Sequence, residues 1–265
     1  MKPRISIILA IVVLLAVAGA GINFASRMLG GEPTLRLVLN IPASRLDVYE
    51  QGQRIRSYDV SVGARGFETP PGNYKVFRVV WNPWWHPPKS EWAQGRKVAP
   101  PGPLNPMGRV KLQFAPLLYL HGTTDEGRLG APASHGCVRM SNADVIELAR
   151  LIHDRTTRVP ESVLDALASS PRQTRTFGLS RPVPLSVSYD IVEVYDGNVI
   201  VYPDVYRRKK SNIREQVVKV LEKEGIDVAR VDPGLMNRLS KQRIATRLTV
   251  PLDTLLADVA SEGSR

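Results

Sequence analysis

Apolar and polar residues alternate along much of the first half of this 265-residue chain. The alternation runs through residues 35–39, 45–49, 55–62 and 74–80, and Pro70-Pro71-Gly72 interrupts it before the last of these stretches. Alternation of this kind is typical of strands that bury one face. The pattern therefore predicts a series of short β-strands connected by turns.

Residues 81–109 follow these strands and are too rich in proline for a helix or a central strand. A loop of this length within a compact domain often serves as a binding loop or a lid. Trp81, Trp84 and Trp85 lie in it, and they could either stack on a ligand or fix the loop to the core. The sequence leaves both uses open.

Cys137 lies between a predicted strand and a predicted helix. Residues 117–120 form a short apolar strand that ends next to His121, and Ser141 with Asp144 three residues later is a variant of the capping box that starts a helix. The buried face of this helix is expected to consist of Val145, Ile146, Leu148, Ala149 and Ile152. Cys137 is therefore expected in a turn before the helix, where a substrate can reach it.

The last third of the chain predicts a separate unit. Residues 185–194 and 198–202 flank Asp196-Gly197, a pair that suits the tight type I′ turn of a β-hairpin. An amphipathic helix is predicted over residues 212–224, and Gly225 is expected to end it.

Two folded units follow from this division. Residues 34–170 are predicted to form a main domain that carries Cys137, and residues 181–265 an accessory C-terminal subdomain of unassigned role. The basic run at residues 207–210 is expected to be a solvated face rather than a binding site.

The N-terminus indicates export. Lys2 and Arg4 precede 22 residues without a formal charge, residues 5–26, in which Ile, Leu, Val and Ala dominate. Ala18-Gly19-Ala20 resembles a cleavage site, but the uncharged run is also long enough for a membrane-spanning helix of about 20 residues. Residues 1–30 are therefore expected to be a signal peptide or a signal anchor, which predicts the periplasm or cell envelope, with anchoring in the inner membrane in the second case.

Export also makes Cys137 unusual. It is the only cysteine of the sequence, so no internal disulfide can form, although the cell envelope permits disulfides. An unpaired thiol in an exported protein is liable to oxidation. This favours a use of its reactivity over a role as a small buried apolar residue.

The net charge of +11 raises nucleic acid or an anionic surface as a partner. Export argues against nucleic acid, and the sequence holds no zinc-finger, helix-turn-helix or RNA-binding motif. An anionic envelope surface, or merely a solvated surface, is the simpler interpretation.

The residues around Cys137 suggest how its thiol is activated, since a thiol with a pKa of about 8.5 needs a base or positive neighbours to react at neutral pH. His121, 16 residues upstream, is the candidate base and later proton donor to a leaving amine. His135 could shape the site or contact substrate, and the amides around Gly136 and Cys137 are candidate donors to an oxyanion. Arg139 could hold a substrate carboxylate or lie in an ion pair.

Two other uses of this cluster fit less well. His121, His135 and Cys137 match no common zinc spacing, and no obvious fourth ligand lies near them in the sequence, so no metal is predicted. A sortase-like transpeptidase would also use His, Cys and Arg, but the residues around its cysteine do not resemble this string.

Several motifs surround Cys137. They are His121-Gly122-Thr123, Gly130, Ser134-His135-Gly136-Cys137-Val138-Arg139-Met140 and Asp144. Upstream lie Thr-Pro-x-Gly, Asn-Pro-x-Trp and Gly-Pro-x-Asn-Pro-x-Gly segments, at residues 69–74, 82–88 and 102–108. Together they resemble the YkuD-type, ErfK-like L,D-transpeptidase family of bacterial peptidoglycan enzymes, over residues 34–155.

The resemblance implies an α+β, mainly β fold, a β-sandwich with flanking helices, and a two-step reaction without metal or cofactor. Cys137 would attack the carbonyl of the third residue of a peptidoglycan stem peptide and release the terminal D-alanine. An amine would then resolve the thioester. Carbapenem-type inhibitors are expected to react with the same cysteine.

The resemblance also implies residue roles. His121 matches the general base and the carbonyl of Gly122 the group that orients it. The oxyanion hole is framed by His135, Gly136 and Cys137. The substrate-side positions are Ser134, Arg139 and Thr123.

The acceptor stays open at the sequence level. A neighbouring diaminopimelate amine would give a 3-3 cross-link, a lysine of an envelope lipoprotein would give protein attachment, and water or a free D-amino acid are further options. A catalytically silent wall-binding scaffold and an L,D-carboxypeptidase that uses water are the competing functions.

Overall fold

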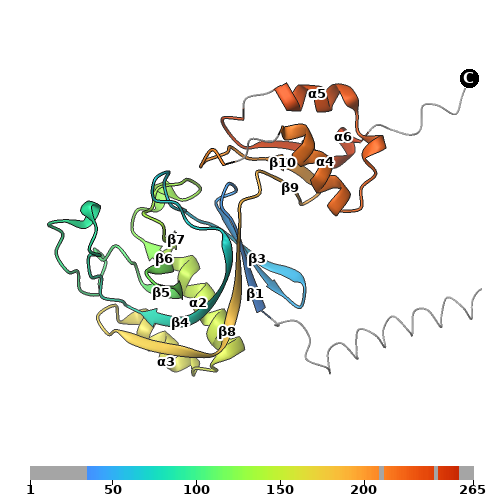
Figure 1. The fold of residues 1–265 in the computed structure, drawn as a ribbon. Coiled ribbons are helices and arrows are strands. Elements are labelled where there is room, and N and C mark those ends of the chain that lie inside the picture. The colour runs from blue at the N-terminus through green and yellow to red at the C-terminus, as the bar shows by residue number, and fades with distance from the viewer. Residues whose placement is uncertain (1–34, 209–211, 242–243, 257–265) are drawn as a thin grey trace, which may run out of the picture.

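One mixed sheet of eight strands dominates the computed structural model, which describes residues 35–208, 212–241 and 244–256 (Figure 1). The strands are β1 Leu35–Asn40, β2 Arg45–Glu50, β3 Gln53–Asp59, β4 Gly72–Trp81, β5 Val110–Ala115, β6 Leu118–Thr123, β7 Val138–Ser141 and β8 Arg175–Ser188. Their order across the sheet is β3-β2-β1-β8-β4-β5-β6-β7. The mainly β, α+β class is confirmed, and each predicted stretch of the first half contains a strand. Strands β5 and β7 were not named by the sequence interpretation, and the predicted strand over residues 185–194 is interrupted at residues 189–191.

The two edges of this sheet approach each other. Ser61, in the segment that follows edge strand β3, exchanges backbone hydrogen bonds of 2.8 and 2.9 Å with Arg139 in the opposite edge strand β7. Gly63 forms a further bridge with Ser134. The sheet therefore curves round on itself, as Figure 1 shows, and the two layers of the expected sandwich are halves of one curved sheet.

Helix α2, Asn142–Thr156, begins where the sequence predicts. The Ser141 hydroxyl accepts a hydrogen bond from the Asp144 amide at 3.0 Å, which makes Ser141 the N-cap. The predicted buried residues Val145, Leu148, Ala149 and Ile152 are inaccessible to solvent, and Ile146 is partly buried. This face packs against β5, β6 and β8, and helix α3, Glu161–Ser169, follows.

Strand β8 changes the predicted division of the chain. It lies between β1 and β4 in the middle of the large sheet, and Val183, Leu185 and Val187 point into the core. The predicted boundary at residue 181 falls inside this strand and is wrong, because a local pattern of alternation does not say which sheet a strand joins. The main domain extends to Ser188.

The C-terminal subdomain contains a three-stranded antiparallel sheet with the order β11-β10-β9. Its elements are β9 Val192–Tyr195, β10 Asn198–Val201, α4 Ile213–Lys223, η3 Val228–Arg230, α5 Pro233–Lys241, β11 Leu248–Pro251 and α6 Leu252–Leu255. Asp196 and Gly197 have φ values of 48° and 72°, as a type I′ turn requires, so the predicted hairpin turn is confirmed. Gly225, with φ 72°, lies just beyond the end of the predicted helix.

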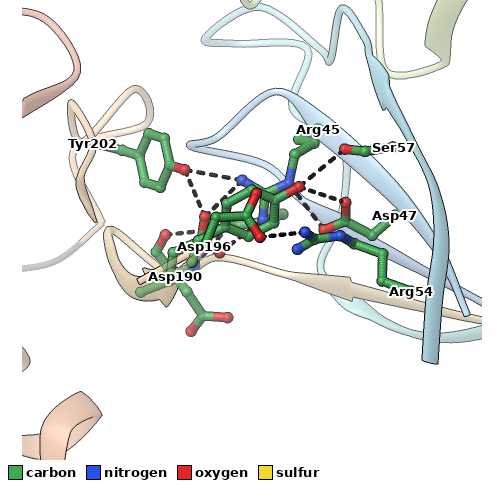
Figure 2. A network of polar contacts seen from close by, with 10 residues as sticks. Arg45, Asp47, Arg54, Ser57, Asp190, Asp196 and Tyr202 are labelled. Carbon is green, nitrogen blue, oxygen red and sulfur yellow. Dashed lines mark hydrogen bonds and ion pairs between the residues drawn. The ribbon is translucent and has the colours of Figure 1, made fainter. Parts of the chain in front are cut away.

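A polar network joins this subdomain to β2 and β3 (Figure 2). Arg45 donates to Asp47 at 2.9 Å and to Glu193 at 2.7 Å. The Tyr202 hydroxyl accepts from Arg45 at 3.0 Å and donates to Glu193 at 2.5 Å. The guanidinium of Arg45 also lies 3.6 Å from the ring centroid of Tyr195. Largely buried charges therefore hold the two units together.

The predicted export segment, residues 1–30, lies outside the described residues. Within the part of the chain that the structure describes, no helix is both long and apolar enough to cross a membrane.

His153 in α2 is fully buried. It accepts a hydrogen bond from the Trp81 indole N–H at 3.1 Å through Nε2 and contacts the Thr157 hydroxyl at 2.7 Å through Nδ1. An indole can only donate, so Nε2 must be unprotonated. Burial lowers the pKa of His153 to about 4.

Acid is therefore expected to destabilise the fold through His153. Above the unfolded-state pKa of about 6.5, histidine is neutral in both the folded and the unfolded protein, so its protonation does not affect stability. Below that pH only the unfolded state takes up the proton, and the free energy of unfolding falls until the folded-state pKa of about 4 is reached. Between pH 7 and 4.5 the loss should be about 2–3 kcal/mol of unfolding free energy, measured by urea unfolding. His153→Gln removes this part of the pH dependence, whereas the exposed His86→Gln should keep it. A His153→Gln protein with the wild-type pH dependence would contradict this origin.

Candidate active site

Strands β6 and β7 bring the predicted site residues together. They pair in parallel, with Leu120 opposite Val138 and His121 opposite Arg139. Cys137 directly precedes Val138 and so comes opposite Tyr119. Paired residues of neighbouring strands share a face, and diagonal neighbours lie about 7–8 Å apart, within reach of long side chains. The register therefore places Cys137, His121 and Arg139 on one face of the sheet.

The opposite face explains why this arrangement is rigid. Leu112 in β5, Leu120 in β6, and Val138 and Met140 in β7 are fully buried. Because a shift by one residue would expose all of them, the core fixes the register of the three strands. On the site face β5 contributes Lys111, which is opposite His121 and which the sequence interpretation did not identify.

His121 is buried and held in one orientation. Its Nδ1 lies 2.7 Å from the carbonyl oxygen of Gly122, which can only accept, so Nδ1 carries the proton and Nε2 is free to take one. Burial lowers the pKa of His121 to about 4, against the effect of the Gly122 hydrogen bond, and the charges of Arg139 and Lys111 lower it further. The imidazole is neutral at pH 7, as a general base must be.

Gly122 must be a glycine for this geometry to exist. A Cβ there would lie 2.3 Å from Oδ1 of Asn142, the first residue of α2. That oxygen accepts the Arg109 amide at 2.8 Å, and the Asn142 side-chain NH₂ donates to the Thr123 carbonyl at 2.9 Å. The start of α2 is thus packed directly against the peptide that orients His121.

Cys137 is partly buried at the start of β7. Its thiol donates to the Leu117 carbonyl at 3.3 Å, in the turn between β5 and β6, where Leu117 has φ 60°. Burial raises the pKa of the Cys137 thiol, while a backbone hydrogen bond from Tyr119 and the charges of Arg139 and Lys111 act in the opposite direction. The resting pair is therefore a thiol and a neutral imidazole, and attack requires proton transfer to a base.

Ser134 shapes the nucleophile turn from inside. It is buried, its hydroxyl donates to the Cys137 carbonyl, and it accepts the Gly136 amide at 3.2 Å. The Gly136 amide is therefore occupied and does not serve as the expected oxyanion donor. The amides of His135 and Cys137 have no protein acceptor among the described residues, so they are the available donors.

Thr123 and Arg139, the two other residues predicted to contact substrate, differ in what their side chains contact. Thr123 is buried and its hydroxyl accepts the Asp125 amide at 3.1 Å, so it stabilises a turn rather than facing a ligand. Arg139 is partly buried on the site face and makes no ion pair with a described carboxylate. The charge of Asp125 nevertheless acts on Arg139 and raises its pKa against the effect of burial, so both uses named for Arg139 stay predictions.

His135 is exposed between two aromatic rings. Trp92 stacks on it with a centroid distance of 4.1 Å, and Phe67 meets it edge-on at 4.7 Å. Trp92 lies in the long loop between β4 and β5, in the short helix η1 Glu91–Ala93, and no signal in the sequence singles it out as the partner of His135. Trp81 is fully buried, so it fixes the loop and cannot stack on a ligand, whereas Trp84 is exposed.

A thiol and an oriented neutral imidazole thus share one face of the sheet, and the backbone amides of His135 and Cys137 lack a protein acceptor among the described residues, a set of groups that suits acyl transfer. His121, His135 and Cys137 do not form a group that could hold a metal ion, and no such group occurs among the described residues.

Residues 34–160 match the family model YkuD, described as the L,D-transpeptidase catalytic domain. The match lies within the main domain, which is therefore similar to the catalytic domain of L,D-transpeptidases. The resemblance seen in the sequence is confirmed.

Curated relatives carry the same name. The chain is 34% identical over 118 residues to the probable L,D-transpeptidase YbiS of Escherichia coli, which covers 41% of this chain and 39% of the relative. It is 29% identical over 163 residues to the probable L,D-transpeptidase ErfK/SrfK of Salmonella typhimurium, covering 58% and 47%. The chain thus spans less than half the length of these relatives.

Solved structures of L,D-transpeptidases are also similar. L,D-transpeptidase 3 from Mycobacterium tuberculosis in complex with a faropenem-derived adduct is 14% identical, with a TM-score of 0.39, covering 60% of this chain and 61% of that one. LdtMt1 in complex with imipenem is 17% identical, with a TM-score of 0.37, covering 58% and 59%.

Proposed function

We propose that this protein is an L,D-transpeptidase that acts on peptidoglycan tetrapeptide stems through a thioester on Cys137. The observation that carries the proposal is the shared sheet face of Cys137 and His121, with His121 held neutral by burial and oriented by the Gly122 carbonyl. At rest the thiol donates to the Leu117 carbonyl, and in the proposed reaction His121 removes the thiol proton as the sulfur attacks.

The first half-reaction transfers the acyl group to the enzyme. The sulfur of Cys137 bonds to the carbonyl carbon of the third stem residue, and the amides of His135 and Cys137 stabilise the oxyanion. The imidazolium of His121 then protonates the leaving amine, the C–N bond breaks and D-alanine departs. An acceptor amine completes the cycle by attacking the thioester, with His121 again as base.

The site face carries positive charge that suits this substrate. Arg139 and Lys111 are partly buried there, and burial lowers the pKa of both side chains. A stem peptide ends in carboxylates, and a carboxylate beside these two cations would restore the charge balance that burial disturbs. Within the same proposal the chain works in the periplasm or cell envelope, in line with its expected export segment.

The deciding experiment is release of D-alanine from a purified tetrapeptide stem by the full chain. We expect turnover with the wild type and a mass adduct on Cys137 with a carbapenem, whose strained carbonyl can acylate a thiol. A wild-type protein that neither releases D-alanine nor forms the adduct would support the silent scaffold instead.

The acceptor is a separate question that muropeptide mass spectrometry answers. Cells with and without the protein are compared for 3-3 cross-linked dimers, for stems attached to an envelope lipoprotein, and for tripeptides formed with water. We favour an amine acceptor, and an increase in tripeptides alone would identify an L,D-carboxypeptidase.

A further inference from the structure

Tyr206 of the C-terminal subdomain reaches into the main domain behind the nucleophile. Its hydroxyl donates to the Gly63 carbonyl at 2.7 Å and accepts from the Thr69 amide at 3.2 Å. The tyrosine is buried, with 4% of its surface exposed. Both partners lie in the segment between β3 and β4, so a single hydroxyl restrains this segment at two points.

Thr69 transmits this restraint to the turn that carries Cys137. Its hydroxyl accepts from the Gly63 amide at 2.8 Å and donates to the Gly136 carbonyl at 2.9 Å. Thr69 is fully buried, and a Cβ on Gly63 would lie 2.6 Å from the Thr69 amide, so nothing larger fits between them. A continuous path of direct hydrogen bonds leads from Tyr206 through Thr69 to Gly136.

Tyr206 is held firmly on its own side of the interface. Its amide donates to the Tyr189 hydroxyl at 2.7 Å, and that hydroxyl donates to Asp204. The two tyrosine rings stack with a centroid distance of 5.4 Å. Arg208 lies over both rings and pairs with Glu68, the residue before Thr69. The hydroxyl of Tyr206 therefore has little freedom to follow a moving partner.

We propose that Tyr206 is a positioning residue for acyl transfer, through which the C-terminal subdomain holds the Gly136–Cys137 peptide in its reactive orientation. The free amides of His135 and Cys137 flank the carbonyl that Thr69 anchors, so a loosened anchor misaligns oxyanion donors and sulfur together. The inference rests on the proposed function, since it assigns Tyr206 an effect on that reaction. The subdomain thereby receives a role in the chemistry.

Two tyrosine-to-phenylalanine variants of the full chain test this assignment. Tyr206→Phe removes the hydroxyl that leads to Gly136. Tyr202→Phe removes a hydroxyl from the same interface, bonded to Arg45 and Glu193, with no path to the nucleophile turn. Both should lower the melting temperature. Only Tyr206→Phe should lower kcat for D-alanine release, by about 5- to 30-fold, with KM changed by less than about 2-fold.

A second pair of variants tests the path itself. Thr69→Val removes the hydroxyl that links Gly63 to Gly136, and Thr69→Ser retains it. Thr69→Val should lower kcat as Tyr206→Phe does, Thr69→Ser should stay near the wild type, and the double variant Tyr206→Phe/Thr69→Val should be no slower than Thr69→Val alone, because the two act through one carbonyl.

Alkylation of Cys137 separates this inference from the proposed function. Cys137 is the only cysteine of the sequence, so iodoacetamide reports on it alone, whether or not the stem peptide is a substrate. A loosened turn should expose the sulfur and speed alkylation in Tyr206→Phe but not in Tyr202→Phe. Equal alkylation rates in the two variants, or equal losses of kcat, would overturn the positioning role of Tyr206.

Discussion

Replacing Cys137 with alanine is expected to reduce D-alanine release to the background rate, a loss of about 10³-fold or more. The side chain is small and lies at the start of β7, where the buried residues Val138 and Met140 keep the strand in register without it. The melting temperature should therefore change little. Release of D-alanine from the tetrapeptide stem, followed by mass spectrometry, is the measurement, together with loss of the carbapenem adduct.

His121→Gln should lower turnover by a comparable factor, because glutamine cannot take the thiol proton. The two residues act in one proton transfer, so their effects should not add. The double variant is expected to be no slower than Cys137→Ala. Turnover that survives in Cys137→Ala would show that another group is the nucleophile, and full activity in His121→Gln would exclude His121 as the base.

The second large effect is expected at the interface shown in Figure 2. Arg45→Met keeps the length of the side chain and removes its charge. Asp47 and Glu193, whose side chains are 5% and 19% exposed, would then lack their cation. Removing one partner of a buried ion pair costs about 3–5 kcal/mol, because the remaining charge stays desolvated. Denaturant unfolding of the full chain should show a loss of this size.

Arg54→Met is the matched control within the same network. Arg54 pairs with Asp196, whose side chain is 60% exposed, and exposed pairs contribute about 0–1 kcal/mol. A loss for Arg45→Met that is no larger than the loss for Arg54→Met would contradict the view that buried charge holds the subdomain in place.

The interface also bears on the chemistry. The nucleophile turn contacts the segment between β3 and β4, and Tyr206 of the subdomain holds that segment. If the positioning role of Tyr206 is correct, Arg45→Met at temperatures well below its melting point should retain catalysis as long as the Tyr206 hydroxyl keeps its partners. Stability and alignment would then be separate contributions of one interface.

The sequence correctly predicted the elements that local physics specifies. The alternation of apolar and polar residues predicted most of the strands. The start of α2 was predicted from Ser141 and Asp144, and a hairpin turn from Asp196-Gly197. Each of these features depends on residues that are close in the chain. The motifs around His121 and Cys137 also identified the family, because reactive side chains need particular neighbours at fixed spacing.

The sequence failed where a residue's role depends on the backbone geometry of a turn. Ser134 and Thr123 looked like substrate contacts, yet their hydroxyls are used inside the fold by Cys137, Gly136 and Asp125. The sequence is the same whether a polar side chain near Cys137 contacts substrate or forms hydrogen bonds within the protein. Only the folded backbone shows which donor or acceptor reaches it first.

The sequence by itself indicated a candidate nucleophile, its candidate base and the strand-rich class of the main domain, because those follow from side-chain chemistry and periodicity. The tertiary structure alone decided that β8 belongs to the large sheet and that Tyr206 lies behind the turn that carries Cys137. These contacts join residues up to 148 positions apart in the chain. Such pairs form only when the whole core has closed, so no local pattern encodes them.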